Sequence, residues 1–153
     1  MNKFVNAAIF AGSLVTFGVA VLAAPADVIA SRQQSFKQIG KANKGIMDEL
    51  KSGAPSIANV RANADQLASL APQITRWFPR GSGPEAGVKT SALPVIWQRT
   101  PEFVKDAAAL NNAVKTLRAA AASGDVARIT AAMPAVGAAC KACHETFRAR
   151  TRD

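Results

Sequence analysis

The sequence predicts an all-α protein, folded as an antiparallel four-helix bundle. Four segments place apolar residues at three- and four-residue intervals, the spacing of one helix face. The sequence has no runs that alternate β-branched and polar residues, and no two-residue hairpin signals. Because each helix carries one apolar stripe, four such helices bury their stripes together when they pack as a bundle.

The first 24 residues have the features of a secretory signal peptide. Lys3 precedes an apolar run over residues 4–24, which ends in the small residues Ala23, Ala24 and Ala26. An uncleaved anchor is the alternative, because about 20 apolar residues can span a bilayer. The glycines, the alanines and the A-x-A-like end favour cleavage. We therefore expect a signal peptide at 1–24 and a single domain at 25–153.

Two helices are expected in the first half of this domain. The first extends from a cap at Asp27 to the residues before Gly53, and the second covers residues 55–74 with Pro72 in its last turn. The two apolar stripes consist of Ile29, Phe36, Ile39, Ile46 and Leu50, and of Ile57, Val60, Ala64, Leu67 and Ala71.

Residues 79–94 predict a long crossover connection, because glycines and prolines interrupt a polar stretch. A short apolar anchor follows, made of Leu93, Ile96 and Trp97. The third helix begins at a capping Thr100 and ends at Gly124. Its stripe consists of Phe103, Ala107, Leu110, Val114, Leu117 and Ala121.

Asp125 is the expected cap of the fourth helix, whose stripe continues to Phe147. Pro134 lies within this helix and lacks a backbone donor, so it predicts a kink or a late start. The stripe consists of Val126, Ile129, Met133, Val136, Cys140, Cys143 and Phe147. The two cysteines therefore lie on the core face.

The fourth helix carries Cys140-Lys141-Ala142-Cys143-His144, which contains both cysteines and the only histidine of the chain. C-x-x-C-H is the spacing of covalent c-type haem attachment. Residues i, i+3 and i+4 share a helix face, so both thiols can reach the haem vinyl groups while His144 ligates the iron. We expect one covalently bound haem c per chain, on the C-terminal helix. In bacteria this attachment takes place in the periplasm, in agreement with the signal peptide.

Haem attachment competes with four other interpretations of the motif. A redox dithiol of this spacing belongs to a βαβ setting, which a helical chain does not provide. A zinc site needs about four protein ligands, and the chain has no further Cys or His. A structural disulfide and a chance occurrence remain. Haem is favoured because the motif accounts for every Cys and His in the chain.

The net charge of +9 falls to +8 when Lys3 leaves with the signal peptide. Basic proteins of this size can bind nucleic acid or membranes, but here the charges are scattered along helical faces and the chain is exported. We expect neither nucleic acid nor, after signal cleavage, a membrane as a partner. Arg148, Arg150 and Arg152 form a basic cluster beside the haem motif.

Four segments of the domain share a pattern with a known family. They are RQQSFKQIG at 32–40, WFPRGS at 77–82, ALPVIW at 92–97, and the terminal C-K-A-C-H that continues as HETFR at 144–148. With its haem motif in the last helix, the chain resembles the class II c-type cytochromes, in particular cytochrome c prime. The resemblance implies a homodimer formed through the first two helices, and binding of nitric oxide and carbon monoxide.

A second axial ligand would have to be a methionine, since the chain has no second histidine. Met133 shares the helix of the motif and therefore its side of the haem. By the resemblance, Phe36 occupies the position of the distal methionine of low-spin relatives, and Met47 lies about 16 Å further along the helix. Phe36 cannot coordinate iron, so we expect a five-coordinate, high-spin haem that small diatomics reach when the ring swings aside. An ordinary core phenylalanine is the alternative.

Two arginines are candidate pocket residues. Arg148 lies one turn beyond His144, and the resemblance implies that it lines the proximal side; a solvated helix-end cation is the alternative. Arg32 lies one turn before Phe36, and the resemblance implies pairing with a haem propionate; an exposed surface arginine is the alternative. The two tryptophans, Trp77 and Trp97, are expected to pack rather than to relay electrons.

These observations predict a non-enzymatic haem protein that binds nitric oxide and carbon monoxide and exchanges electrons with periplasmic proteins. A dedicated electron-transfer cytochrome without a gas-binding role is the alternative. An enzyme such as a peroxidase needs a positioned distal acid or base, and no second histidine exists to serve.

Overall fold

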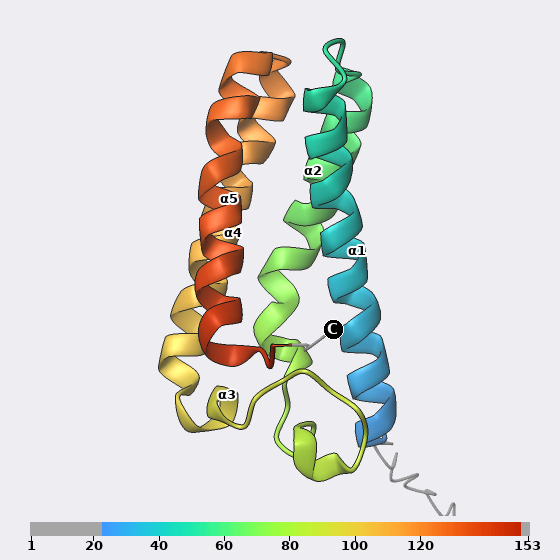
Figure 1. Ribbon diagram of the computed structural model, residues 1–153, viewed down its shortest axis with the longest axis vertical. Helices are drawn as coiled ribbons and strands as arrows, with labels where there is room; N and C mark the ends of the chain where they lie inside the picture. The colour runs from blue at the N-terminus through green and yellow to red at the C-terminus, as the bar shows by residue number, and fades with distance from the viewer. Residues whose placement is uncertain (1–22, 151–153) are drawn as a thin grey trace, which may run out of the picture.

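A computed structural model describes residues 23–150 and confirms the antiparallel four-helix bundle (Figure 1). The bundle consists of α1 (Pro25–Lys51), α2 (Ile57–Leu70), α4 (Thr100–Ser123) and α5 (Val126–Phe147). The short helix α3 (Val95–Gln98) and the 3₁₀ helices η1 (Ala71–Trp77) and η2 (Pro84–Ala86) lie between α2 and α4. No strand forms within 23–150, in agreement with the sequence.

The helices pack as two antiparallel pairs. α1 packs against α2 and α4 packs against α5, while contacts between α2 and α4 join the pairs (Figure 1). The predicted stripe of α4 is buried in full, and most of the other stripes are buried as expected. Some members are half-buried, and Val126 is the one exposed member, since it begins α5 at the end of the bundle and is 40% exposed. The sequence pattern therefore identified nearly the whole core.

Several helix boundaries differ from the prediction. Thr100 is the first residue of α4 instead of its cap, and no side-chain hydrogen bond caps this helix. α1 begins at Pro25, so Asp27 lies in the first turn instead of capping it. The second helix ends at Leu70 and continues as η1, because Pro72 has no N–H to sustain the α-helical bonds. A late start of α5 at Pro134 is wrong, since α5 runs without a break from Val126 to Phe147.

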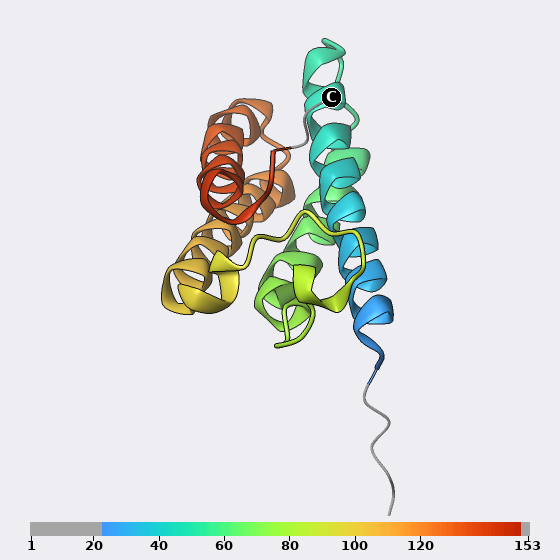
Figure 2. The same ribbon diagram turned by 60° about the horizontal axis from the view of Figure 1, so that its bottom comes forward.

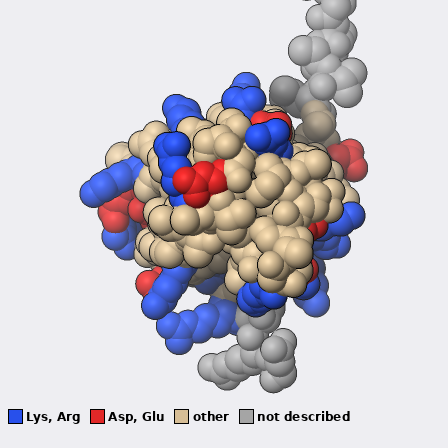
Figure 3. Space-filling view, turned by 90° about the horizontal axis from the view of Figure 1, so that it is seen from above, with Lys and Arg blue, Asp and Glu red and all other residues tan. Residues whose placement is uncertain are grey.

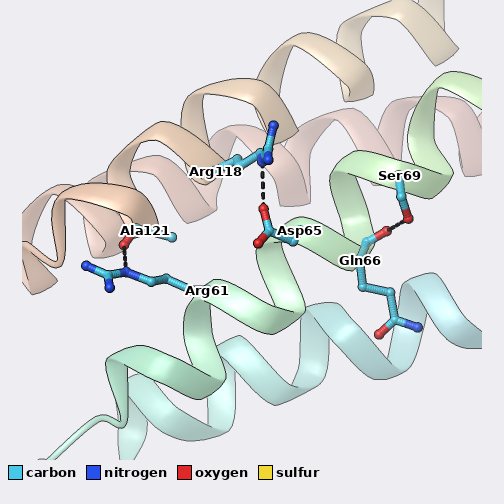
Figure 4. A network of polar contacts seen from close by, with 6 residues as sticks. All are labelled: Arg61, Asp65, Gln66, Ser69, Arg118 and Ala121. Atoms are coloured by element: carbon cyan, nitrogen blue, oxygen red, sulfur yellow. Dashed lines mark hydrogen bonds and ion pairs between the residues drawn. The ribbon is translucent and has the colours of Figure 1, made fainter.

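Polar contacts join α2 to α4 at the end of the bundle where α4 turns into α5 (Figure 4). The Nε of Arg61 donates to the carbonyl of Ala121, which also accepts from the Gly124 amide, and its Nη2 donates to the carbonyl of Ala122, both at 3.0 Å, so the side chain supplies donors to the end of α4. Arg118 pairs with Asp65 across the same two helices. Gly124 then reverses the chain with a φ of +74°, a conformation that favours glycine.

The long connection closes the opposite end of the bundle (Figure 2). The amide of Leu93 donates to the carbonyl of Phe147, and the amide of Ala149 donates to the carbonyl of Ser91. These bonds frame an isolated antiparallel bridge between Ala92 and Arg148. Arg148 and Ala149, which follow α5, are therefore tied to the connection.

The charged side chains are spread over the surface, as the sequence indicated. Figure 3 looks onto the end of the bundle that carries the α1–α2 and α4–α5 turns, and Lys and Arg side chains lie around its rim with acidic groups among them. The ion pairs within residues 23–150 are all exposed: Arg118 with Asp65 between helices, and the local pairs Lys44 with Asp48, Arg99 with Glu102 and Lys141 with Glu145. Such pairs contribute little to stability.

The predicted signal peptide, 1–24, lies outside the described residues except for Ala23 and Ala24. The domain predicted at 25–153 coincides at its start with the first residue of α1. Among the helices of residues 23–150, none is long and apolar enough to cross a membrane.

Candidate functional site

A cavity of about 590 Å³ lies between α1, which belongs to the α1–α2 pair, and α5, which belongs to the α4–α5 pair. Its size falls in the range of about 300–1,000 Å³ that holds cofactors and small molecules. Most of the lining is apolar. The side chains that matter below are Arg32, Phe36, Gly40 and Asn43 from α1, Phe103, Asp106 and Leu110 from α4, and Cys140, Cys143, His144 and Phe147 from α5, followed by Arg148.

α5 presents both cysteines and the histidine to this cavity. The Cys140 and Cys143 side chains are half-buried and form no disulfide with each other. Burial raises the pKa of the Cys140 thiol, and burial with smaller effects of Asp106 and Cys140 raises the pKa of Cys143 to about 11. Both thiols are therefore protonated at neutral pH and line an apolar wall.

His144 lies at the exposed edge of the same wall. Burial of part of the ring lowers its pKa, and the positive charge of Arg148 lowers the pKa further. The imidazole is consequently neutral at neutral pH. A neutral imidazole has a free nitrogen lone pair, which is the form that ligates a metal ion.

Phe36 lines the cavity from α1, opposite the helix that carries the motif. The ring is half-buried and makes T-shaped contacts with Trp77 at 5.3 Å and with Phe78 at 6.1 Å between centroids. Met47 is 40% exposed, and neither Met47 nor Met133 lines the cavity. Within residues 23–150, no methionine therefore reaches this space.

Arg32 is 3% exposed, so its interpretation as an exposed surface arginine is wrong. Its Nη1 donates to the carbonyl of Trp77 at 3.3 Å and to the hydroxyl of Ser82 at 3.1 Å. Its Nη2 donates to the carbonyl of Ser82 and to the hydroxyl of Thr90, both at 3.0 Å. Burial lowers the pKa of the guanidinium, and the nearby Glu85 opposes that shift. The predicted pairing with a propionate stays a prediction.

Arg148 follows the last helical residue and adopts an extended conformation. Its amide donates to the carbonyl of His144 at 3.2 Å, and its exposed side chain lines the cavity. The bridge to Ala92 fixes its backbone. Arg148 therefore lies near His144 with a solvated side chain, and its place on the proximal side of a haem stays a prediction.

The family model described as cytochrome c' matches residues 27–148 of this chain. The chain belongs to the cytochrome c' family. It is 35% identical to the cytochrome c' of Pararhodospirillum photometricum over 127 residues, which cover 82% of this chain and 99% of the relative.

Solved cytochromes c' share the fold of this chain. One of them is a cytochrome c' described as having an unusual ligand-controlled dimer dissociation. It is 31% identical to this chain and superposes with a TM-score of 0.78, and the match covers 86% of this chain and 100% of that cytochrome. Another is the nitric oxide complex of a mutant cytochrome c' from Alcaligenes xylosoxidans. It is 29% identical with a TM-score of 0.75, and the match covers 84% of this chain and 98% of that protein.

Cytochromes c' carry a covalently bound c-type haem, so the predicted cofactor, one haem c per chain, is confirmed. They are haem proteins of electron transfer and ligand binding and do not form a classical enzyme family. The cavity of this cytochrome c' fits such a group, because it is large, apolar and lined by two thiols and a neutral imidazole from one helix face.

Three residues of the cavity wall were not foreseen from the sequence. A Cβ placed on Gly40 would meet no atom within 4 Å, so α1 offers the cavity a bare strip of backbone one turn after Phe36. The Oδ1 of Asn43 is buried and accepts no hydrogen bond within the described residues. Asp106 approaches Cys143 from α4. Of the three, only Gly40 could have been noticed in the sequence, since a glycine inside a helix often marks a place where another group packs close to the backbone.

Proposed function

We propose that this cytochrome c' is a periplasmic haem protein that binds nitric oxide and carbon monoxide at a five-coordinate, high-spin haem and exchanges electrons with periplasmic proteins. It is not an enzyme in this proposal. The periplasmic location rests on the signal-peptide pattern of residues 1–24 and on the place where c-type haem is attached. The haem supplies an iron with one open coordination position, and the residues below determine what reaches that position.

Cys140 and Cys143 would hold the haem covalently, and His144 would ligate its iron. The common placement of the three side chains on the cavity side of α5 supports this assignment. The neutral state of His144 supports it as well, because a protonated imidazole has no lone pair to offer. Addition of the two thiols across the haem vinyl groups would give thioethers, which are apolar like the rest of this wall.

Phe36 is the proposed distal residue, and its place in the cavity is the observation that carries the gas-binding function. The ring lies on α1, across the cavity from His144, and offers no atom that can coordinate iron. An apolar ring also offers no hydrogen bond to a bound diatomic. The pocket therefore favours small uncharged ligands that need no donor, and nitric oxide and carbon monoxide are ligands of that kind.

The two arginines have different proposed roles. Arg32 places a buried positive charge at the cavity edge, where it complements a negatively charged propionate even though both of its Nη groups have other partners. Arg148 lines the side of the cavity near His144, where its charge meets a ligand or propionate on the proximal side. Both roles are electrostatic and require no movement of α1 or α5.

A homodimer through α1 and α2 is proposed by analogy with the relative that shows ligand-controlled dimer dissociation. The nitric oxide complex of the Alcaligenes xylosoxidans relative supports nitric oxide as the ligand. Neither nucleic acid nor a membrane is a proposed partner of the mature chain, because its charges are scattered and both signs occur on its surface (Figure 3).

The electronic absorption spectrum of the purified holoprotein tests this function. In the ferrous state we expect a five-coordinate, high-spin spectrum that changes when nitric oxide or carbon monoxide is added. A six-coordinate, low-spin ferrous spectrum without added ligand would replace this proposal by the alternative, a dedicated electron carrier. Hydrogen peroxide turnover well above that of free haem would contradict the non-enzymatic assignment.

A further inference from the structure

Trp77 packs against Phe36, a residue of the cavity wall. The two rings meet edge to face, with centroids 5.3 Å apart and planes at 84°. Phe36 and its other aromatic neighbour, Phe78, line the cavity, whereas Trp77 does not. The indole of Trp77 therefore packs against a ring of the cavity wall without lining the cavity itself.

The indole is attached to a segment that is fixed from two directions. Trp77 is the last residue of η1, and its carbonyl accepts a hydrogen bond from Nη1 of Arg32. The next residue, Phe78, has its ring under the Arg32 guanidinium at 4.4 Å. The carbonyls of Phe78 and Pro79 both accept from Nε1 of Trp97, at 3.0 and 3.1 Å.

These restraints limit where the Phe36 ring can go. Phe78 blocks one direction, since its ring contacts Phe36 and packs in turn against Phe103 at 4.9 Å. Trp77, which contacts Phe36 but does not line the cavity, blocks a second direction. Because closely packed aromatic rings move only when their neighbours yield, the ring of Phe36 is held over the cavity.

We propose that Trp77 is a positioning residue for gas binding, which holds Phe36 over the cavity and so slows the entry of nitric oxide and carbon monoxide. Trp77 touches neither the haem nor the ligand in this proposal and acts only through Phe36. The inference rests on the proposed function, since it requires a ligand that enters past Phe36. It assigns Trp77 a role beyond packing.

Carbon monoxide association with the ferrous holoprotein, followed by flash photolysis, tests this role. Phe36→Ala removes the ring and is expected to give the fastest entry. Trp77→Ala leaves Phe36 room to retreat and is expected to raise the association rate about tenfold. Trp77→Phe keeps a smaller ring in place and is expected to give an intermediate rate, and it also serves if the alanine variant does not fold.

The double variant separates positioning from general loosening of the bundle. Once Phe36 is alanine, the indole has no ring to hold, so Phe36→Ala with Trp77→Ala is expected to match Phe36→Ala alone. Val60→Ala is the matched control, because Val60 is fully buried in α2 and does not line the cavity. It is expected to lower stability without changing the association rate.

Two results would overturn the inference. One is a wild-type association rate in both Trp77 variants while Phe36→Ala is fast. The other is an independent, multiplicative effect of Trp77→Ala in the Phe36→Ala background. Failure of the proposed function looks different, because the unmodified ferrous protein would then be six-coordinate or would not bind carbon monoxide.

Discussion

The guanidinium carbon of Arg32 lies 4.4 Å from the centre of the Phe78 ring, which places a buried cation over an aromatic face. The same guanidinium donates four hydrogen bonds to Trp77, Ser82 and Thr90. One side chain of α1 therefore holds both ends of the connection that closes the cavity end of the bundle. Arg32, Phe78 and Thr90 all line that cavity.

Replacing Arg32 is expected to loosen that connection. Arg32→Ala leaves buried acceptors without a donor and should lower the free energy of unfolding by about 2–4 kcal/mol. Arg32→Lys should recover only part of the loss, because a lysine ammonium cannot reproduce the planar guanidinium, which donates from two nitrogens at once. Denaturant unfolding of the holoprotein measures the loss, and amide exchange at 78–94 should become faster.

Arg80→Ala is the control for this prediction, since Arg80 lies in the same connection and is exposed. It should stay within about 0.5 kcal/mol of the unmodified protein. An equally small change in Arg32→Ala would show that the hydrogen bonds of Arg32 do not hold the connection.

Glu49 makes the α1–α2 turn sensitive to pH. Its carboxylate accepts from the side chain of Asn59 at 2.7 Å and from the amide of Ser56 at 2.8 Å, and these bonds lower its pKa, the Asn59 bond most. A lowered folded-state pKa stabilises the fold above the unfolded value of about 4.3, and this stabilisation disappears as the pH falls through the folded pKa.

Thermal unfolding of Glu49→Gln should therefore show a lower midpoint at pH 7 and a difference that shrinks below about pH 4. Asp48→Asn removes only the exposed pair with Lys44 and should follow the unmodified protein at every pH. A Glu49→Gln difference that is constant from pH 7 to about pH 3 would contradict the role of the charged carboxylate.

Asp125 starts the helix that carries the haem motif. Its Oδ1 accepts from the amides of Ala127 at 2.9 Å and Arg128 at 3.1 Å. Asp125→Ala should cost about 0.5–2 kcal/mol of stability, whereas Asp125→Asn keeps an acceptor and should cost less. Because this cap lies at the end of α5 away from Cys140, the absorption spectrum should not change, and a spectral change would mean that the cap affects the site.

Phe36 is expected to determine the coordination number of the iron. Phe36→Met places a thioether in the cavity opposite His144 and should convert the ferrous spectrum from high-spin to low-spin, with slower carbon monoxide binding. Phe36→Leu is the matched control and should remain high-spin. A high-spin spectrum in Phe36→Met would indicate that α1 does not bring this position over the iron.

The fold could be predicted from the sequence because its information is local. The stripe from Phe103 to Ala121 repeats with the helical period, and each of its members is buried. The caps at Asp125 and Gly124 were also readable from residue type. The placement of Asp27 as a cap failed because Pro25 already favours the first helical turn.

The site residues also differ in whether the local sequence predicts where they lie. Cys140, Cys143 and His144 lie within five residues, so helix geometry alone brings them to one face. The partners of Arg32 lie 45 to 58 residues away along the chain, and no local pattern encodes contacts over that separation. Asn43 and Asp106 were missed for the same reason, since only the packed bundle places them on the cavity wall.

The covalent bond between haem and α5 is the claim on which the account depends, and the mass of the intact chain tests it most directly. After expression with a c-type maturation system and export, we expect a polypeptide heavier than its sequence by one haem, and a Cys140→Ser, Cys143→Ser variant without that addition. A purified mature chain with the mass of the polypeptide alone, under conditions in which a known c-type cytochrome is matured, would contradict the account.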